Sequence, residues 1–252
     1  MERHFTLSCN EIHLWQADLS STEPSILPLL RALSADEYAR AERYALPHLR
    51  RRFVVARGIL RSLVGSYLGI VPSEVRFCYG AFGKPMLDEA RHKEALAFNL
   101  SHTEDFALFA FSLVHDIGVD VERIQKSFEV LSLAQQHFSI NEYAALSALP
   151  TELQLSAFYA CWTRKEAYLK AKGSGIANHL SKFDVTVSPK ESAQLLRIEG
   201  EAEEARGWKL LDIPVPPEYH ATVAVANRDC QLKCFSWQHD FVNLTPHLKS
   251  GI

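Results

Sequence analysis

Residues 117–122 read Ile-Gly-Val-Asp-Val-Glu, and apolar and acidic side chains alternate over the last four of them. A period of two residues is typical of a β-strand, because successive side chains in a strand point to opposite faces. Asp120 and Glu122 therefore share one face, and Val119 and Val121 share the other. The segment predicts a half-buried strand that carries two carboxylates.

The sequence on either side predicts helices and strands in a repeated order. Helical spacing predicts helices over residues 34–45, 48–68, 129–148 and 152–172. Short apolar runs between Gly, Pro, Asn or Asp predict strands over residues 11–17, 75–79, 95–100, 106–113, 117–121, 183–187, 208–211, 220–226 and 230–237. Ser34 and Glu37 form a capping box at the start of the first helix, and Gly173 ends the last one.

This order of elements predicts the fold class. Strand, helices, strands, helices and strands follow one another, which favours α+β with antiparallel sheets over the regular βαβ alternation of a doubly wound fold. Helices followed by strands occur twice, so the pattern permits two similar halves that meet near residue 115.

Composition excludes several classes of protein. The chain has 252 residues with a net charge of −3, from 27 basic and 30 acidic residues, so no basic excess favours nucleic acid. An apolar content of 47 % is too high for wholesale disorder. No apolar run approaches the roughly 20 residues of a membrane span. The first residues lack a secretory apolar region, and the five scattered cysteines fit free thiols, so we expect a cytoplasmic protein without a membrane partner.

Two segments carry acidic residues that could hold a metal ion. Asp120 and Glu122, about 7 Å apart along a strand, can converge on one hard cation, which prefers oxygen ligands. The alternative is a solvated acidic face. On the helix, Glu166 and Lys170 are i, i+4 neighbours that extend an apolar stripe through Trp162. There the alternative is a surface ion pair. Gly118 permits close approach of another backbone or a ligand.

Three further segments could bind phosphate. Residues 40–61 carry seven arginines and one acid, which suits phosphate oxygens but also a solvated helical face. Residues 79–85 contain two glycines and Lys84, which predicts either a phosphate-binding turn or a plain hairpin. Ser101 and His102 end a predicted strand and point apart, so they favour hydrogen bonds to a phosphate over a hydrolase dyad.

Taken together and in order, these motifs resemble the 4′-phosphopantetheinyl transferase family. They are Gly-Lys-Pro at 83–85, Phe-Asn-Leu-Ser-His at 98–102, Gly-Val-Asp-Val-Glu at 118–122 and Trp-Thr-Arg-Lys-Glu-Ala-x-x-Lys at 162–170. The resemblance covers residues 34–187 and is strongest to the double-length, surfactin-synthetase-activating type of bacteria and cyanobacteria. It implies a pseudodimer of two similar halves, each a small antiparallel sheet packed with a long helix. Residues 1–115 would then contact coenzyme A, and residues 116–252 would carry the metal carboxylates and the catalytic helix.

The same resemblance implies a role for individual residues. The magnesium ligands would be Asp120, Glu122 and Glu166. The catalytic residues would be Glu166, Lys170 and Glu142. The groups that bind coenzyme A would be Arg40, Arg57, Lys84, Ser101, His102, Lys165 and Lys170. The immediate proton acceptor stays open between Glu166, Glu142 and a metal-bound water.

The resemblance also implies an activity and its partners. The chain would transfer 4′-phosphopantetheine from coenzyme A to a serine of an apo acyl or peptidyl carrier protein, with Mg²⁺ or Mn²⁺ as cofactor. We expect a monomer that binds no nucleic acid. The alternatives are a metal-dependent hydrolase of coenzyme A or nucleotides, and a non-catalytic relative that binds carrier proteins.

Overall fold

The structure is a computed structural model that describes residues 5–20, 26–92, 95–113, 116–126, 129–174, 180–199 and 203–237. Its helices are α1 (Ile26–Ala32), α2 (Ala35–Glu42), α3 (Pro47–Leu68), α4 (Val130–His137), α5 (Ile140–Ser147) and α6 (Thr151–Lys172), with short 3-10 turns at Pro72–Glu74, Leu180–Lys182 and Glu204–Gly207. Its strands are β1 (Glu11–Asp18), β2 (Phe77–Tyr79), β3 (Pro85–Leu87), β4 (Ala97–Thr103), β5 (Phe106–Ser112), β6 (Ile117–Arg123), β7 (Phe183–Val185), β8 (Leu195–Ile198), β9 (Lys209–Asp212), β10 (Tyr219–Val225) and β11 (Gln231–Ser236).

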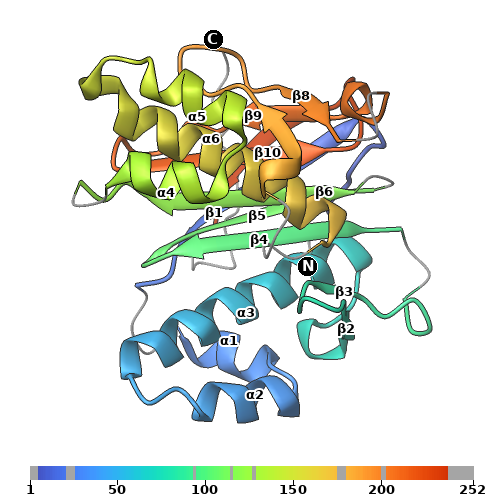
Figure 1. Cartoon of the computed structure of the whole chain (residues 1–252). Coiled ribbons are helices and arrows are strands. Elements are labelled where there is room, and N and C mark those ends of the chain that lie inside the picture. Colours follow the sequence, from blue (N-terminus) through green and yellow to red (C-terminus); the bar gives the residue numbers. More distant parts are fainter. Residues whose placement is uncertain are drawn as a thin grey trace.

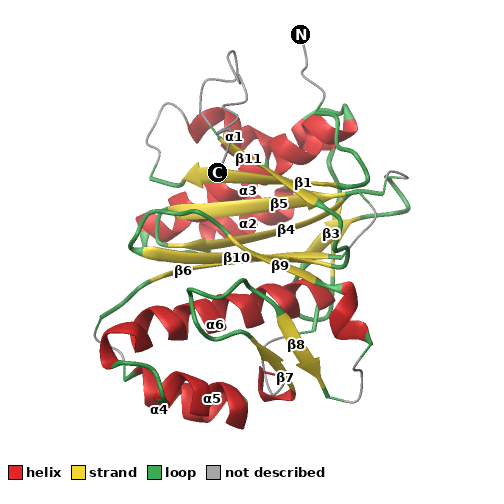
Figure 2. Ribbon diagram, turned by 90° about the horizontal axis from the view of Figure 1, so that it is seen from above, coloured by secondary structure: helices red, strands yellow, loops and turns green. Residues whose placement is uncertain are grey.

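The elements form four layers, with two sheets between two long helices (Figures 1 and 2). The first sheet has the strand order β11-β1-β5-β4 and lies on α3, and the second has the order β6-β10-β9 and lies under α6. A third apolar cluster, with Leu14 and Leu108 from the first sheet and Val119 and Val223 from the second, joins the two sheets. The predicted α+β class, with a long helix on each small sheet, is confirmed.

The two long helices resemble each other in length and in how they end. Both α3 and α6 have 22 residues, and each is followed by a glycine in the left-handed conformation, Gly69 with φ 69° and Gly173 with φ 67°. A side chain with a Cβ is disfavoured at such a position, so glycine ends the helix. The repeated helix and sheet agree with the predicted pseudodimer.

The last strand belongs to the sheet of the other half. β11 pairs parallel with β1, with Glu11 opposite Gln231, so residues from the end of the chain complete the first sheet. The sequence division at residue 115 therefore separates the two long helices but not this strand. The sequence also gave no signal for α1 or for β8, both of which are short. None of the helices within the described ranges combines the length and hydropathy needed to cross a membrane.

Candidate functional site

The two halves meet where β4 runs beside β6. The Val119 N–H donates to Asn99 Oδ1 at 2.9 Å, and the Val121 N–H lies 3.4 Å from Ser101 Oγ. Side chains of β4 thus bond the backbone of β6 across the junction. This arrangement brings the Phe-Asn-Leu-Ser-His and Gly-Val-Asp-Val-Glu motifs together, which are 20 residues apart in the chain.

Three acidic side chains lie at this junction. Asp120 and Glu122 lie on one face of β6, next to α6, which carries Glu166. Asp120 is 2 % exposed and Glu166 is 3 % exposed. Both carboxylate oxygens of Glu166 and Oδ2 of Asp120 are buried without a hydrogen-bond partner. Buried carboxylate oxygens that lack donors are costly, so the cluster favours a cation.

The pKa values of these acids reflect their crowding. Burial and, second, the charge of Asp120 raise the pKa of Glu166 to about 7, against the opposite effect of Lys170. Burial also raises the pKa of Glu122 to about 7, with Asp120 again the second cause. Like charges in a desolvated site oppose ionisation. A carboxylate with a pKa near neutral pH can accept a proton and release it again.

Lys170 occupies part of the acidic cluster. Its Nζ donates to Asp120 Oδ1 at 2.5 Å and to Ser101 Oγ at 2.9 Å. The ammonium thus joins α6 to both β4 and β6. Within the described ranges, no three His, Cys, Asp or Glu side chains surround a common point closely enough to form a metal cluster. The Lys170 ammonium balances part of the negative charge of Asp120, Glu122 and Glu166.

A cavity of about 560 Å³ opens beside Lys170. It is lined by Phe82, Gly83, Lys84, Pro85, Asn99, Leu100, Ser101, His102, Leu169, Lys170, Gly173 and Ser174. Lys84 reaches across from the β2–β3 turn, and its Nζ donates to Ala171 O at 3.0 Å and Ile117 O at 3.3 Å. Burial lowers the pKa of Lys84. Four of the residues predicted to bind coenzyme A therefore line one cavity at the junction.

Glu142 and Lys165 lie elsewhere, and here the structure differs from the sequence expectation. Lys165 has no exposed surface, and its Nζ bonds Glu142 Oε1 at 2.6 Å, Glu142 Oε2 at 2.7 Å and Phe183 O at 2.5 Å. Glu142 also accepts from the N–H groups of Ser139 and Val185. The Lys165 ammonium and the Glu142 carboxylate are therefore ion-paired with each other. The pair joins α5, α6 and β7, so a catalytic role for Glu142 and coenzyme A binding by Lys165 do not fit this geometry.

Arg40 and Arg57, the two arginines predicted to bind coenzyme A, are also placed outside the cavity lining. Arg40 is exposed, with its guanidinium 5.2 Å from the centre of the Phe53 ring. Arg57 donates to buried Glu37 at 2.6 Å and stacks over Phe77 and Tyr79. Arg57 thus fixes the β2 strand that leads to the Lys84 turn.

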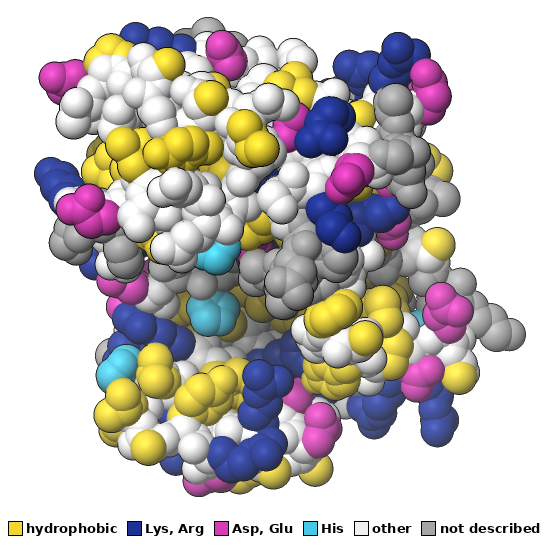
Figure 3. Space-filling view, viewed as in Figure 1, with side chains coloured by type: hydrophobic (Ala, Val, Ile, Leu, Met, Phe, Trp, Pro, Cys, Tyr) yellow, Lys and Arg dark blue, Asp and Glu magenta, His cyan; other side chains and the backbone are white. Residues whose placement is uncertain are grey.

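The surface around α2 and the start of α3 is both apolar and basic. Tyr38, Leu46 and Leu49 are exposed there. Figure 3 shows hydrophobic and basic side chains intermingled at the lower end of the molecule, over these helices. Much of the positive charge is paired, since Arg50 binds Glu42 and Arg52 binds Asp105 at 2.8 Å. This pairing favours the interpretation of the arginine-rich stretch as an ion-paired helical face.

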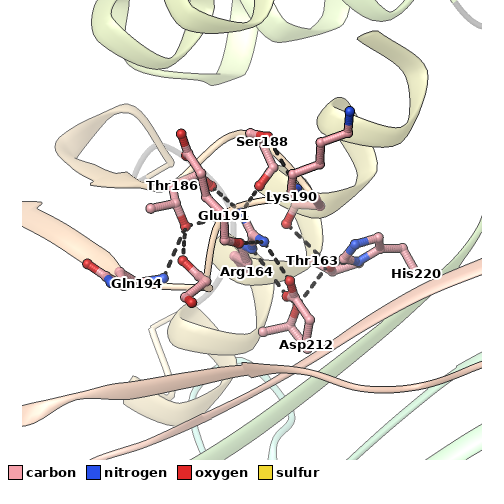
Figure 4. Close-up of polar contacts among 12 residues, drawn as sticks. Thr163, Arg164, Thr186, Ser188, Lys190, Glu191, Gln194, Asp212 and His220 are labelled. Carbon is pink, nitrogen blue, oxygen red and sulfur yellow. Dashed lines mark hydrogen bonds and ion pairs between the residues drawn. The ribbon is translucent and has the colours of Figure 1, made fainter. Parts of the chain in front are cut away.

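A polar network lies next to the acidic cluster, and no separate motif in the sequence predicted it (Figure 4). Its members are Thr163 and Arg164 of α6, Asp212 of β9, and His220 and Thr222 of β10. Arg164 has no exposed surface and binds Asp212 through two nitrogens, at 3.2 and 2.5 Å. Thr163 and Arg164 stand inside a quoted motif, but Asp212 and His220 are isolated in the sequence.

Comparison with known proteins identifies related chains. The model of a family described as the 4′-phosphopantetheinyl transferase superfamily matches residues 116–224, and one described as 4′-phosphopantetheinyl transferase, N-terminal, matches residues 15–113. The chain is 40 % identical over 238 residues to the 4′-phosphopantetheinyl transferase HetI of Nostoc sp., covering 94 % of both chains. It is 31 % identical over 186 residues to a 4′-phosphopantetheinyl transferase of Bacillus pumilus, covering 73 % of this chain and 76 % of that one. It is 30 % identical over 167 residues to the 4′-phosphopantetheinyl transferase Sfp of Bacillus subtilis, covering 62 % of this chain and 72 % of that one.

Proposed function

The chain belongs to the 4′-phosphopantetheinyl transferase superfamily, and from that membership we infer that it transfers 4′-phosphopantetheine from coenzyme A to carrier proteins. The two family models together span both halves, and so does the resemblance to HetI. The nucleophile is then a serine hydroxyl of the carrier, which agrees with the absence of a nucleophile elbow from the sequence. The products are the holo carrier and adenosine 3′,5′-bisphosphate.

We propose that Asp120, Glu122 and Glu166 hold a divalent cation, with Mg²⁺ as the first choice. The three carboxylates supply only oxygen, which is the donor that Mg²⁺ prefers. A cation would satisfy the buried oxygens of Asp120 and Glu166 that lack a hydrogen-bond partner among the described residues, and it would relieve the raised pKa of Glu122 and Glu166. When bound, the ion would polarise the pyrophosphate oxygens and stabilise the leaving phosphate.

The basic and polar groups of the cavity would orient coenzyme A. Lys170 and Lys84 carry positive charge, and Ser101 and His102 are hydrogen-bonding groups on the same wall. Fixed donors aimed at phosphate oxygens stabilise the charge that develops during phosphoryl transfer. Lys170 would exchange its bond to Asp120 for one to a phosphate oxygen, since it lies within reach of both the acidic cluster and the cavity.

Glu166 would receive the proton of the attacking hydroxyl. A carboxylate that lies beside the attacking hydroxyl can act as a general base, an effect worth about 10²–10⁴-fold. The new bond joins the serine oxygen to the pantetheine-side phosphorus, and the bond from that phosphorus to the nucleotide phosphate breaks. Glu142 is ion-paired with Lys165, so the candidates for the proton acceptor are Glu166 and a water beside it.

The observation that supports this proposal best is the buried acidic cluster facing Lys170 beside the cavity. The test is the intact mass of an apo acyl carrier protein incubated with the chain, coenzyme A and Mg²⁺. We expect a gain of one phosphopantetheinyl group, abolished by EDTA. Glu166→Gln should lower the rate by about 10²–10⁴-fold, whereas Glu152→Gln, an exposed glutamate on the same helix, should leave it unchanged.

A control without carrier separates transfer from hydrolysis. Adenosine 3′,5′-bisphosphate that accumulates at the same rate without carrier would indicate a coenzyme A hydrolase. Coenzyme A binding with neither product would indicate a non-catalytic relative. Full activity of Glu166→Gln would show that Glu166 is not the proton acceptor.

A further inference from the structure

The hydroxyl network (Thr163, Arg164, Asp212, His220 and Thr222) joins three elements of the second half. Thr163 Oγ1 on α6 lies 2.9 Å from His220 Nδ1 and 3.0 Å from Thr222 Oγ1, both on β10. Thr222 Oγ1 lies 3.0 Å from Asp212 Oδ1 on β9. Figure 4 shows the side chains of Thr163, Asp212 and His220 close together. The contacts form one continuous chain from the imidazole to the carboxylate.

Arg164 fixes one end of this chain. Its Nε and Nη2 donate to Asp212, Nη1 donates to Thr186 O at 2.7 Å and Ser188 O at 3.1 Å, and Nη2 also donates to Glu191 O at 3.1 Å. Each of the three guanidinium nitrogens therefore has an acceptor. A buried arginine with a complete set of acceptors is held in one geometry. Asp212 is consequently held in place by Arg164 and presents an acceptor to the hydroxyl chain.

The protons along the network can be placed in one order. The Thr222 hydroxyl donates to Asp212 Oδ1. The Thr222 oxygen is then an acceptor for the Thr163 hydroxyl, and the Thr163 oxygen is an acceptor for His220 Nδ1–H. The carbonyl of Tyr159, 3.0 Å from Thr163 Oγ1, competes with the Thr222 oxygen for the single Thr163 proton. In both cases His220 Nδ1 is the donor to Thr163.

The network lies next to the acidic cluster, on the same face of the sheet and partly on the neighbouring strand. In the β6–β10 ladder, Thr222 is opposite Asp120 and His220 is opposite Glu122. Directly opposed residues of an antiparallel pair share a face. Thr163 precedes Glu166 by three residues, so the two share one side of α6. The same helix turn and the same strand face thus carry both the network and the carboxylates.

We propose that the hydroxyl network positions α6 against β10 and thereby sets the distance between Glu166 and the two carboxylates of β6. The inference rests on the proposed function, because it assigns these residues to the geometry of that site. Carboxylates that repel one another need such an anchor, since nothing else in the cluster holds Glu166 by a hydrogen bond. The network residues act through Glu166 and are positioning residues.

The test uses the full chain with two substitutions of one residue. Thr222→Val keeps the shape of the side chain but removes the hydroxyl, and Thr222→Ser keeps the hydroxyl. We expect Thr222→Val to lower kcat by about 10²-fold, the effect of a misplacement of about 1 Å, with KM for coenzyme A and carrier within a factor of about 3. Thr222→Ser should recover most of kcat. Thr151→Val, on an exposed position of the same helix, is the matched control.

Nitrogen NMR of His220 reports the network independently of activity. The wild-type chain should show the Nδ1–H tautomer, and Thr163→Val, which removes the acceptor of Nδ1, should shift the ring towards Nε2–H. An unchanged kcat in Thr222→Val, equal losses in the Val and Ser variants of Thr222, or an unchanged tautomer in Thr163→Val would overturn the proposal. If Thr222→Val does not fold, Thr163→Val and Thr163→Ser replace the pair. A wild-type chain that transfers nothing would instead refute the proposed function.

Discussion

Gly118→Ala is the substitution whose effect follows most directly from the structure. A Cβ at Gly118 would lie 2.1 Å from Ala167 O and 2.4 Å from Ala171 N, where Cβ atoms essentially never come closer than 3.0 Å. Both atoms belong to the backbone of α6, which cannot rotate away as a side chain could. The helix must therefore retreat from β6 by about 1 Å.

This retreat has two consequences of known size. Overpacking of a well-packed interior costs about 1–3 kcal/mol, and a backbone clash on this scale belongs at the upper end. Movement of Glu166 and Lys170 away from Asp120 by about 1 Å should cost about 10²-fold in turnover. Conformational entropy alone predicts an increase in the free energy of unfolding instead, since Gly→Ala at an unstrained position stabilises a chain by about 0.4–1 kcal/mol.

Urea unfolding and the carrier mass assay measure both effects. Gly207→Ala is the matched control, because a Cβ there would meet no atom within 4 Å. We expect the control to keep the stability and the activity of the wild-type chain. A Gly118→Ala variant as stable and as active as wild type would refute the close approach of α6 to β6 on which the site geometry depends.

Three further predictions concern the charges of the second half. In EDTA, stability should fall as pH rises from about 4.5 to about 7, because burial raises the pKa of Glu122 and Glu166 to about 7, so the folded chain binds more protons than the unfolded one. Mg²⁺ should raise Tm more at about pH 8 than at about pH 5, and an equal rise at both would contradict a carboxylate site. Lys170→Gln should lower the transfer rate by about 10²–10³-fold and should also lower Tm, because it leaves the buried Asp120 carboxylate without its cation; initial rates and a thermal melt can check both. Glu142→Gln should cost about 3–5 kcal/mol, because it leaves the Lys165 ammonium buried and unpaired; a folded, stable but inactive variant would restore a catalytic role to Glu142.

The sequence alone determined the elements whose signals are local. The alternation over residues 117–122 predicted β6, and the left-handed glycine after each long helix was readable from the position of Gly69 and Gly173. The strand period also placed Asp120 and Glu122 on one face. Such signals depend on residues only a few positions apart, so they survive without knowledge of the fold.

Tertiary structure alone decided what depends on contacts between distant segments. Glu142 and Lys165 are of residue types that often act in catalysis, but here they are buried and hydrogen-bonded to each other, which indicates a structural ion pair. Asp212 and His220 join the network only because β9 and β10 fold back against α6. β11 completes a sheet that began more than two hundred residues earlier. No local pattern encodes these contacts, because the free energy that selects them comes from burying both partners together.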